Sequence, residues 1–268
     1  MNSATLGQVS GNAAEIYERF FVPALFQEWA GPVLDAAQVK PGQHVLDVAC
    51  GTGLVARAAV ARVGKFGRVD ALDCNEAMLA VARKHGAEVN WKAGRAEELP
   101  YPDDSFDAVT CQFGLMFFED RVGALREMQR VLRPEGTLAV AVWAGLDVTP
   151  GFAGLAALLD QLFGPEIANA LRMPFCLGDV DELRSIFAAA GQADVAIETR
   201  AGTARFPSLA SWVQTNVRGW SFSNQIDDTG LERLIATAER ELHSLVIEDG
   251  TVAFASPAHL VVMRQRNG

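Results

Sequence analysis

The stretch His44-Val-Leu-Asp-Val-Ala-Cys-Gly-Thr-Gly53 decides the fold of this 268-residue chain. An apolar run that carries a single acid, Asp47, ends in a turn with two glycines, and a helical pattern follows. A strand that leads through glycines into a helix is typical of loops that hold nucleotide cofactors. Glycine lets the backbone approach the ligand, and the start of the helix offers free N–H groups. The stretch therefore predicts a cofactor site at the carboxyl end of a buried strand.

Strand and helix patterns alternate after this stretch. Apolar segments predict strands, and the amphipathic segments between them predict helices. Together with two later strands, this alternation predicts an α/β fold with a doubly wound, mostly parallel sheet of seven strands. The first five expected strands are Val45–Ala49, Arg68–Asp73, Glu88–Ala93, Phe106–Phe113 and Thr137–Trp143, and the expected helices are Leu54–Val63, Glu76–His85 and Asp120–Leu132.

The second half of the chain has a different pattern. Two strand-like segments, Ala193–Phe206 and Thr251–Arg264, are separated by Pro207–Val246, which reads as mainly helical. Helices are also expected at Phe152–Phe163 and Val180–Ala190, and at Asn12–Ala30 near the start. The pattern predicts a helical cap inserted late in the chain. The expected organisation is a helical lid at residues 1–40, a cofactor-binding α/β core at 41–206 and 248–268, and a cap with the substrate region at 207–247.

Composition excludes several classes of function. A formal net charge of −10 argues against a nucleic-acid partner, which requires clustered Lys and Arg. The longest apolar run, Thr137–Leu146, is too short to span a bilayer, and the first twenty residues show no secretory signal. We therefore expect no nucleic-acid partner and no membrane span, and leave the oligomeric state open between monomer and homodimer. No metal-type spacing relates the four cysteines, so we expect buried thiols, no metal site and a cytoplasmic location; they are Cys50, Cys74, Cys111 and Cys176.

The glycine loop alone fits two cofactors. Gly51-x-Gly53-x-x-Ala56, followed by Asp73 about twenty residues later, matches the dinucleotide fingerprint, so an NAD(P)-dependent oxidoreductase is one alternative. Asp73 ends a strand and can accept both ribose hydroxyls, whereas Asn75 is better placed to cap the next helix. Asp47 favours S-adenosylmethionine: an acid inside a strand must be hydrogen-bonded, and it can face an ammonium group that NAD lacks. A satisfied buried acid without a ligand is the alternative for Asp47.

Five motifs in order carry a more specific resemblance. Residues 45–53 (VLDVACGTG) resemble the first motif of class I S-adenosylmethionine-dependent methyltransferases, which have a Rossmann-like fold. Residues 71–79 (ALDCNEAML), 98–107 (ELPYPDDSFD), 112–115 (QFGL) and 127–136 (EMQRVLRPEG) follow in the family's order and spacing. The resemblance covers about residues 40–143. It is to the small-molecule branch of methyltransferase type 11, which includes the ubiquinone and menaquinone C-methyltransferases.

The resemblance implies roles for individual positions. Residues of the glycine loop would surround the methionine part of S-adenosylmethionine, Asp73 would hold the ribose, and Tyr17 would close over the carboxylate unless it only packs its helix. Many relatives have Asp at the position of Arg95; Arg95 accepts no hydrogen bond, so it would stack on the adenine or point to solvent. The implied cofactor residues are Tyr17, Asp47, Ala49, Gly51, Thr52, Gly53, Asp73, Cys74, Met78, Ala96, Glu97, Gln112 and Phe113.

The expected reaction is in-line transfer of a methyl group to a small, partly apolar metabolite, in which the protein mainly aligns the reactants. The catalytic base stays unknown; His243 in the cap is a weak candidate, and His44, His85 and His259 are expected to be structural or solvated. Motifs of nucleic-acid, glutamine and arsenite methyltransferases are absent from the sequence. A cofactor-binding protein without transfer activity is a further alternative. Aromatic residues that could line the acceptor pocket are Phe117, Phe118, Trp143, Trp212 and Trp220.

Overall fold

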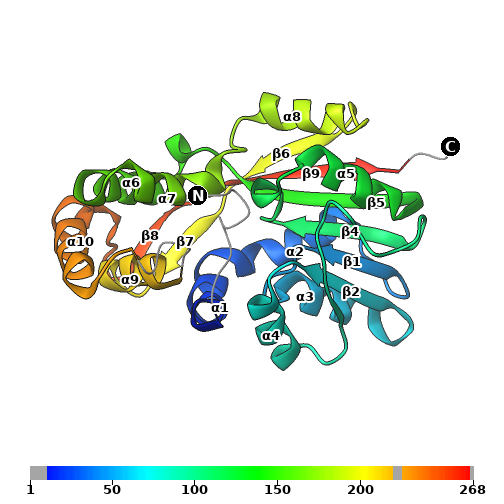
Figure 1. The fold of residues 1–268 in the computed structure, drawn as a ribbon, viewed down its shortest axis with the longest axis horizontal. Coiled ribbons are helices and arrows are strands. Elements are labelled where there is room, and N and C mark those ends of the chain that lie inside the picture. Colours follow the sequence, from blue (N-terminus) through cyan, green and yellow to red (C-terminus); the bar gives the residue numbers. More distant parts are fainter. Residues whose placement is uncertain (1–10, 220–224, 266–268) are drawn as a thin grey trace.

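The computed structural model describes residues 11–219 and 225–265, and its main feature is a seven-stranded sheet (Figure 1). The strands lie in the order β3-β2-β1-β4-β5-β9-β6, and β9 alone runs in the opposite direction to the other six. The order reverses between β1 and β4, which confirms the doubly wound, mostly parallel sheet. The strands are β1 (His44–Val48), β2 (Arg68–Asp73), β3 (Asn90–Ala93), β4 (Phe106–Gln112), β5 (Leu132–Trp143), β6 (Ala196–Arg200) and β9 (Ala258–Arg264).

Helices cover both faces of this sheet. α3 (Leu54–Val63) and α4 (Glu76–His85) pack with α2 (Gln27–Ala36) on one face, and α5 (Arg121–Arg130) packs with α8 (Val180–Ala189) on the other (Figure 1). These helices match the expected ones closely. β5 begins at Leu132 rather than Thr137, because Leu132 pairs with Phe106 before a bulge interrupts the register. Short 3₁₀ turns are η3 (Gly64–Phe66), η4 (Leu115–Phe117), η5 (Leu146–Val148), η6 (Met173–Phe175) and η7 (His243–Leu245).

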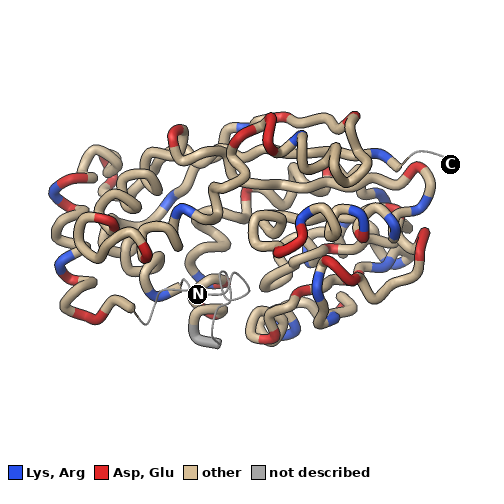
Figure 2. Tube along the Cα trace, turned by 45° about the horizontal axis from the view of Figure 1, so that its top comes forward, with Lys and Arg blue, Asp and Glu red and all other residues tan. Residues whose placement is uncertain are grey.

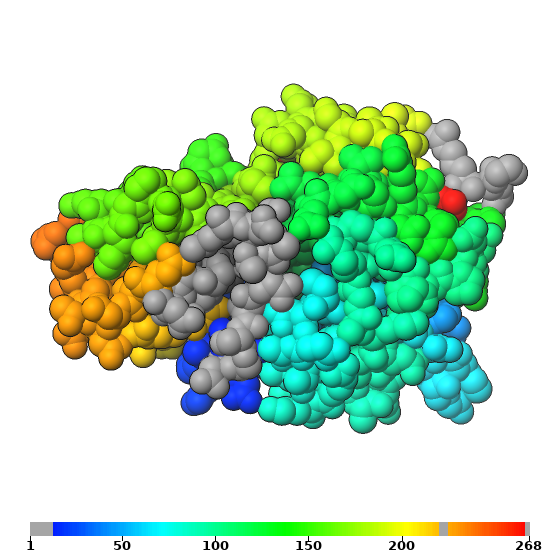
Figure 3. Space-filling view, viewed as in Figure 1, coloured from blue at the N-terminus to red at the C-terminus, as the bar shows by residue number. Residues whose placement is uncertain are grey.

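The helical N-terminal segment contains a π-helix. α1 (Gly11–Ile16) and α2 are joined by η2 (Tyr17–Phe26), which is π-helical and contains Pro23, a residue that lacks the N–H of a regular ladder. α1 packs between α9 (Leu209–Gly219) of the cap and α4 of the core, and Figure 3 shows α1 in dark blue between these two halves. The expected N-terminal helix is thus present, with a π-helical middle.

The late strands are each broken in two, which the sequence analysis did not predict. β7 (Thr203–Phe206) and β8 (Val252–Ala255) leave the main sheet and pair with each other. The break follows β6 at Gly202, where the Trp29 ring occupies the space that a Cβ would need. The small sheet packs instead against α6 (Pro150–Phe163) and α9 (Leu209–Gly219). These two helices pack in turn with α7 (Pro165–Arg172) and α10 (Asp228–Glu241), at the left of Figure 1.

Charges are dispersed over the molecule. Figure 2 shows Lys and Arg interspersed with Asp and Glu over both the core and the cap end. Among residues 11–219 and 225–265, no helix is long and apolar enough to cross a membrane. The prediction of buried thiols is half right: Cys50 and Cys111 are buried, whereas Cys74 and Cys176 are exposed.

Candidate cofactor site

One pocket opens at the carboxyl ends of β1, β2 and β4, where the strand order reverses. Twelve of the thirteen predicted cofactor residues line it, Gly53 being the exception. The structure thus brings together residues from the N-terminal helix and from four separate loops. Further lining residues are Phe26, Cys50, Leu54, Val55, Leu72, Asn75, Gly94, Arg95, Gly114, Phe117, Phe118, Glu119, Trp143, Pro174 and Gly219.

Asp47 is buried within β1 and fully hydrogen-bonded. Its Oδ1 accepts from the Thr110 hydroxyl at 2.8 Å, and its Oδ2 accepts from the Ala56 N–H at 3.1 Å. Burial is the main cause that raises the pKa of this carboxyl to about 7. The acid is therefore satisfied by the protein, and it still borders the pocket.

The turn after β1 depends on left-handed backbone at Ala49, Gly51 and Gly53, with φ values of 55°, 55° and 85°. A Cβ on Gly51 would meet no atom within 4 Å, so this glycine leaves open space beside the pocket. Gly53, unlike the other residues predicted for the cofactor, does not line the pocket. It faces the Trp91 indole, which fills the space of a Cβ.

Trp91 was not singled out in the sequence. It lies in β3 and donates its indole N–H to the Gly86 carbonyl at 2.8 Å. The ring thereby supports the glycine turn from the side away from the pocket. The only sign of this role in the sequence is a large aromatic residue in a short strand. Periodicity alone does not relate that residue to a loop about forty residues earlier.

Asp73 links the end of β2 to the glycine turn. Its Oδ2 accepts from the Gly51 N–H and its Oδ1 from the Asn75 N–H, both at 2.8 Å. Burial raises the pKa of Asp73, while these N–H groups oppose that shift. Asn75 caps α4 by accepting from Ala77 and Met78, as expected. Asp73 is therefore not needed as the cap and presents a carboxylate at the pocket wall.

An ion-paired rim borders the wall that carries Cys74, Ala96 and Glu97. Arg95 is about half exposed and pairs with Glu119 at 2.7 Å and with Glu97 at 3.4 Å. The Glu119 N–H also donates to the Glu97 carboxylate at 3.2 Å. Arg95 thus connects two loops across the rim, an arrangement that the sequence analysis did not foresee.

The other end of the pocket is aromatic. Phe113 stacks on Trp143 with 3.6 Å between ring centroids and 7° between planes, although its φ of 56° is unusual for a bulky residue. Gln112 donates through Nε2 to the Phe26 carbonyl at 3.3 Å. Phe117 and Phe118 also line the pocket. The Tyr17 ring lies tilted against the Phe26 ring, and burial together with the nearby Asp73 raises the pKa of the Tyr17 hydroxyl.

Two predicted residues lie elsewhere. Trp212 is fully buried among Phe152, Phe206 and Phe254, because α9 directs it into the cap core. His243 is exposed on η7 and is not a lining residue, so the structure does not place it near the pocket. Trp220 lies outside the described residues.

The other histidines have structural partners or face solvent. His44 contacts Asp70 at 2.6 Å, and the buried His259 contacts Thr199 and the Gly178 carbonyl. His85 is exposed at the end of α4. Within the part of the chain that the structure describes, no group of acids, cysteines and histidines could hold a metal ion.

The residues of the pocket fit a ligand with polar and apolar parts. Two carboxylates can accept from ammonium or hydroxyl groups, and Gly51 leaves room for close approach of a ligand. The Thr52 hydroxyl is buried without a hydrogen-bond partner among the described residues, as expected where a ligand supplies the missing partner. The aromatic end suits a flat apolar group.

Comparison with known proteins gives consistent matches. Residues 22–149 match the model of the ubiE/COQ5 methyltransferase family. The chain is 34% identical over 188 residues to a demethylmenaquinone methyltransferase of Staphylococcus carnosus, covering 65% of this chain and 78% of that protein. It is 42% identical over 118 residues to the ubiquinone/menaquinone biosynthesis C-methyltransferase UbiE of Hahella chejuensis, covering 42% of this chain. The chain spans 47% of the length of that relative, and 62% of the UbiE of Chromobacterium violaceum.

Solved structures share the fold at low sequence identity. The YcgJ protein of Bacillus subtilis has a TM-score of 0.57 at 22% identity, covering 90% of this chain and 99% of that chain. A phosphoethanolamine N-methyltransferase 2 of Haemonchus contortus, solved with S-adenosyl-L-methionine, has a TM-score of 0.60 at 17% identity, covering 96% of this chain and 58% of that one.

Proposed function

Because the chain belongs to the ubiE/COQ5 methyltransferase family, we propose that it transfers a methyl group from S-adenosylmethionine to a small, partly apolar acceptor. The observation that carries the proposal is one pocket that joins Asp47 and Asp73 at one end to an aromatic end at Phe113 and Trp143. S-adenosylmethionine supplies an activated methyl group on a sulfonium. The protein would contribute alignment of the two reactants, which is worth up to about 7–11 kcal/mol in model reactions.

In this proposal, different pocket residues contact different parts of the cofactor. Asp47 would face the amino group, Asp73 would accept the ribose hydroxyls, and Tyr17 would cover the carboxylate. Cys74 and Met78 would pack on the adenine, with Ala96 and Glu97 at its edge. Residues of the turn, Ala49, Gly51 and Thr52, would follow the methionine part. Gly53 would act on the cofactor only through the shape of the turn.

The acceptor would lie at the aromatic end, against Phe113, Phe117 and Trp143, with Gln112 beside it. The name of the Hahella chejuensis relative specifies C-methylation in ubiquinone/menaquinone biosynthesis, and that of the Staphylococcus carnosus relative specifies demethylmenaquinone. A flat apolar ring of that kind suits stacked aromatic walls. A small metabolite rather than a nucleic acid agrees with the net charge of −10. A cytoplasmic location agrees with four free cysteines.

The surrounding elements would enclose the reaction. We assign residues 1–40 as a lid, 207–247 as the cap, and the seven-stranded sheet with its helices, within 41–206 and 248–268, as the cofactor-binding core; α6, α7, β7 and β8 of those segments pack at the cap end. The small sheet β7–β8 packs with the cap helices and would move with them. A closed site would exclude water from the sulfonium.

Calorimetric titration of the full chain tests the proposal. S-adenosylmethionine and S-adenosylhomocysteine should bind at micromolar concentrations, whereas NADH should not. Binding of NADH with neither adenosyl ligand would favour the oxidoreductase alternative. Incubation with methyl-labelled donor and a metabolite extract then tests transfer: label in an extract component supports the enzyme, and binding without any labelled product favours a cofactor-binding protein.

A further inference from the structure

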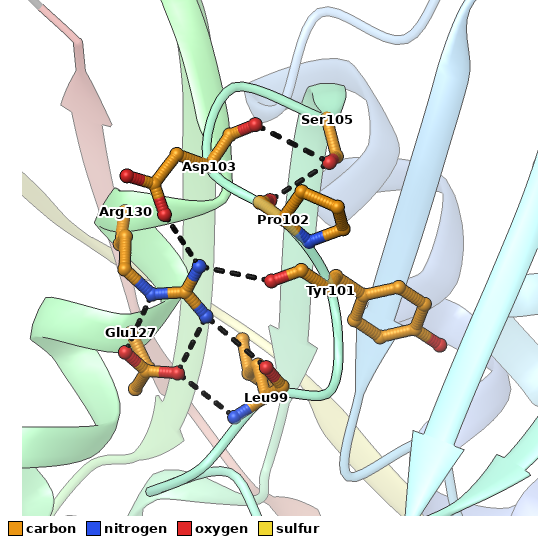
Figure 4. Close-up of polar contacts among 7 residues, drawn as sticks. All are labelled: Leu99, Tyr101, Pro102, Asp103, Ser105, Glu127 and Arg130. Atoms are coloured by element: carbon orange, nitrogen blue, oxygen red, sulfur yellow. Dashed lines mark hydrogen bonds and ion pairs between the residues drawn. The ribbon is translucent and has the colours of Figure 1, made fainter.

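Two sequence motifs with no role in the pocket form one cluster in the structure. Arg130 and Glu127 belong to the motif at residues 127–136, and Leu99, Tyr101 and Asp103 belong to the motif at residues 98–107. Figure 4 shows the Arg130 side chain pointing from α5 into the loop between β3 and β4. None of these five residues lines the pocket.

Arg130 uses its whole donor capacity in this cluster. A guanidinium has five N–H groups, and the structure gives Arg130 five hydrogen bonds (Figure 4). Two go to the Glu127 carboxylate and one to Asp103, each at 2.7 Å. The other two go to the carbonyls of Tyr101 and Leu99, at 2.9 and 3.1 Å. Bidentate pairing of this kind exceeds an ordinary surface ion pair in strength and in directional specificity.

Leu99 is held at both of its backbone groups. Its N–H donates to Glu127 at 2.9 Å, and its carbonyl accepts from Arg130. Leu99 lies outside any strand, so the two side chains of α5 supply the partners that a neighbouring strand would otherwise offer. The buried Leu99 side chain adds an apolar anchor. The position of this residue is therefore fixed relative to α5.

Besides the side-chain contacts of Arg95 and Glu97 with Glu119, the backbone of the pocket wall at Arg95–Glu97 is held on both sides. Upstream, the Gly94 N–H donates to the Asp73 carbonyl at 3.1 Å. Downstream, Leu99 is fixed by Glu127 and Arg130. Between them the Glu98 N–H closes a turn on the Arg95 carbonyl at 3.3 Å. Loss of the downstream anchor would free one end of a wall that is only a few residues long.

We propose that Arg130 and Glu127 are positioning residues that set the pocket wall at Arg95–Glu97 for the adenine of the cofactor. This inference rests on the proposed function for the identity of the ligand. The pair acts through Leu99, without contact to the ligand.

The test measures ligand discrimination as well as affinity. S-adenosylhomocysteine and S-inosylhomocysteine differ only on the six-membered ring of the base, so their ratio of Kd values reports how the wall meets the base. Arg130→Lys keeps the charge but offers three donors from a single nitrogen atom, which cannot replace the planar fork. We expect this variant to raise the Kd of S-adenosylhomocysteine about tenfold, which corresponds to about 1.4 kcal/mol, and to bring the two Kd values closer together.

Arg133→Lys is the matched control. Arg133 belongs to the same motif and pairs with Asp107 at 2.7 Å, at the start of β4 and away from the wall. The Arg133→Lys variant should change the Kd of S-adenosylhomocysteine by less than twofold. If Arg130 had only a structural role, Arg130→Lys would lower the folded fraction of the protein and weaken the apparent binding of both ligands equally. The ratio of the two Kd values would then stay at the wild-type value, and that result would overturn the inference.

Amide hydrogen exchange in the free protein gives a second readout that requires no ligand. The Glu98 amide should exchange at least tenfold faster in Arg130→Lys and at the wild-type rate in Arg133→Lys. Equal exchange in all three proteins would refute the positioning role. If the wild-type chain bound neither adenosyl ligand, the proposed function would fail, and the exchange rates would still decide whether Arg130 holds the wall.

Discussion

The carboxylate of Asp47, inside β1, accepts a hydrogen bond at 3.1 Å from the backbone N–H of Ala56, in the first turn of α3. Gly53 precedes this helix and has no side chain with which to cap it. Asp47 therefore satisfies one of the free N–H groups of the helix from a neighbouring strand. The same carboxylate borders the cofactor pocket, so strand, helix and ligand site meet at one acid.

The affinity for S-adenosylhomocysteine should fall as the pH is lowered through 7. The pKa of Asp47 in the free protein is about 7, and a cationic amino group binds the carboxylate form better than the protonated form. Below pH 7 the ligand must displace a proton, so the Kd should rise by up to about tenfold per pH unit. Calorimetry between pH 5.5 and 8.5 measures this change. Asp47→Asn should bind more weakly and without this pH dependence; an equal dependence in the variant would assign it to another group.

Asp47 should also make the free protein less stable as the pH rises from about 4 to 7. Its pKa in the folded state is raised above the ordinary value of 3.8, so the folded protein keeps a proton that the unfolded chain releases. This contribution to stability is fully present below pH 4 and is lost by pH 7, at no more than about 1.4 kcal/mol per pH unit. The difference in unfolding free energy between wild type and Asp47→Asn, measured with urea at each pH, should follow that slope. A flat difference would contradict the raised pKa.

Asp73→Ala should weaken binding of S-adenosylhomocysteine at least tenfold, or about 1.4 kcal/mol. The substitution removes the proposed acceptor of the ribose hydroxyls and leaves the Gly51 N–H without its partner. Asp70→Ala is the control: Asp70 lies in the same strand and pairs with His44 and Arg68, outside the pocket. Asp70→Ala should reduce stability and leave the Kd unchanged. Unchanged binding in Asp73→Ala would refute the ribose assignment.

Much of the core could be predicted from the sequence because its signals are local. The apolar strands of the first half alternate with helices whose ends carry their own caps, such as Asn75 and Asp120. The lining of the pocket follows from topology, since parallel strands end at the same edge of the sheet. The structure places twelve of the thirteen residues that the motifs predicted for the cofactor in one pocket.

The misses depend on contacts between distant segments. The breaks at Gly202 and Pro257 divide two strands that read as continuous, and the first break is fixed by Trp29 from the other end of the chain. Trp212 was placed at the substrate because helical spacing cannot distinguish a core aromatic from a pocket aromatic. Gly53 was assigned to the ligand, although its neighbour is Trp91. Only a structure shows which side of a turn faces the pocket.

Phe113 and Trp143 should be energetically coupled. Their rings stack at 3.6 Å and 7°, and both are buried. Aromatic pairs contribute about 0.5–1.5 kcal/mol beyond the area that they bury. A double-mutant cycle with Phe113→Leu and Trp143→Leu, followed by urea unfolding, should give a coupling of about 1 kcal/mol. Phe152→Leu paired with Trp143→Leu is the comparison, because those two rings have no direct stacking contact; an equal coupling there would show general loosening of the core.

Gly53→Ala should destabilise the protein for two separable reasons. The φ of 85° strains any residue with a side chain, at a cost of about 1–3 kcal/mol, and the new methyl would overlap the Trp91 indole. Trp91→Ala removes the overlap while losing the packing of the ring. In the double variant the total loss of unfolding free energy should therefore be at least about 1 kcal/mol smaller than the sum of the two single losses. Gly51→Ala is the matched control, since its Cβ would meet no atom within 4 Å and its cost should add to that of Trp91→Ala. Additive losses in the Gly53 pair would show that the indole moves aside and does not hold the turn.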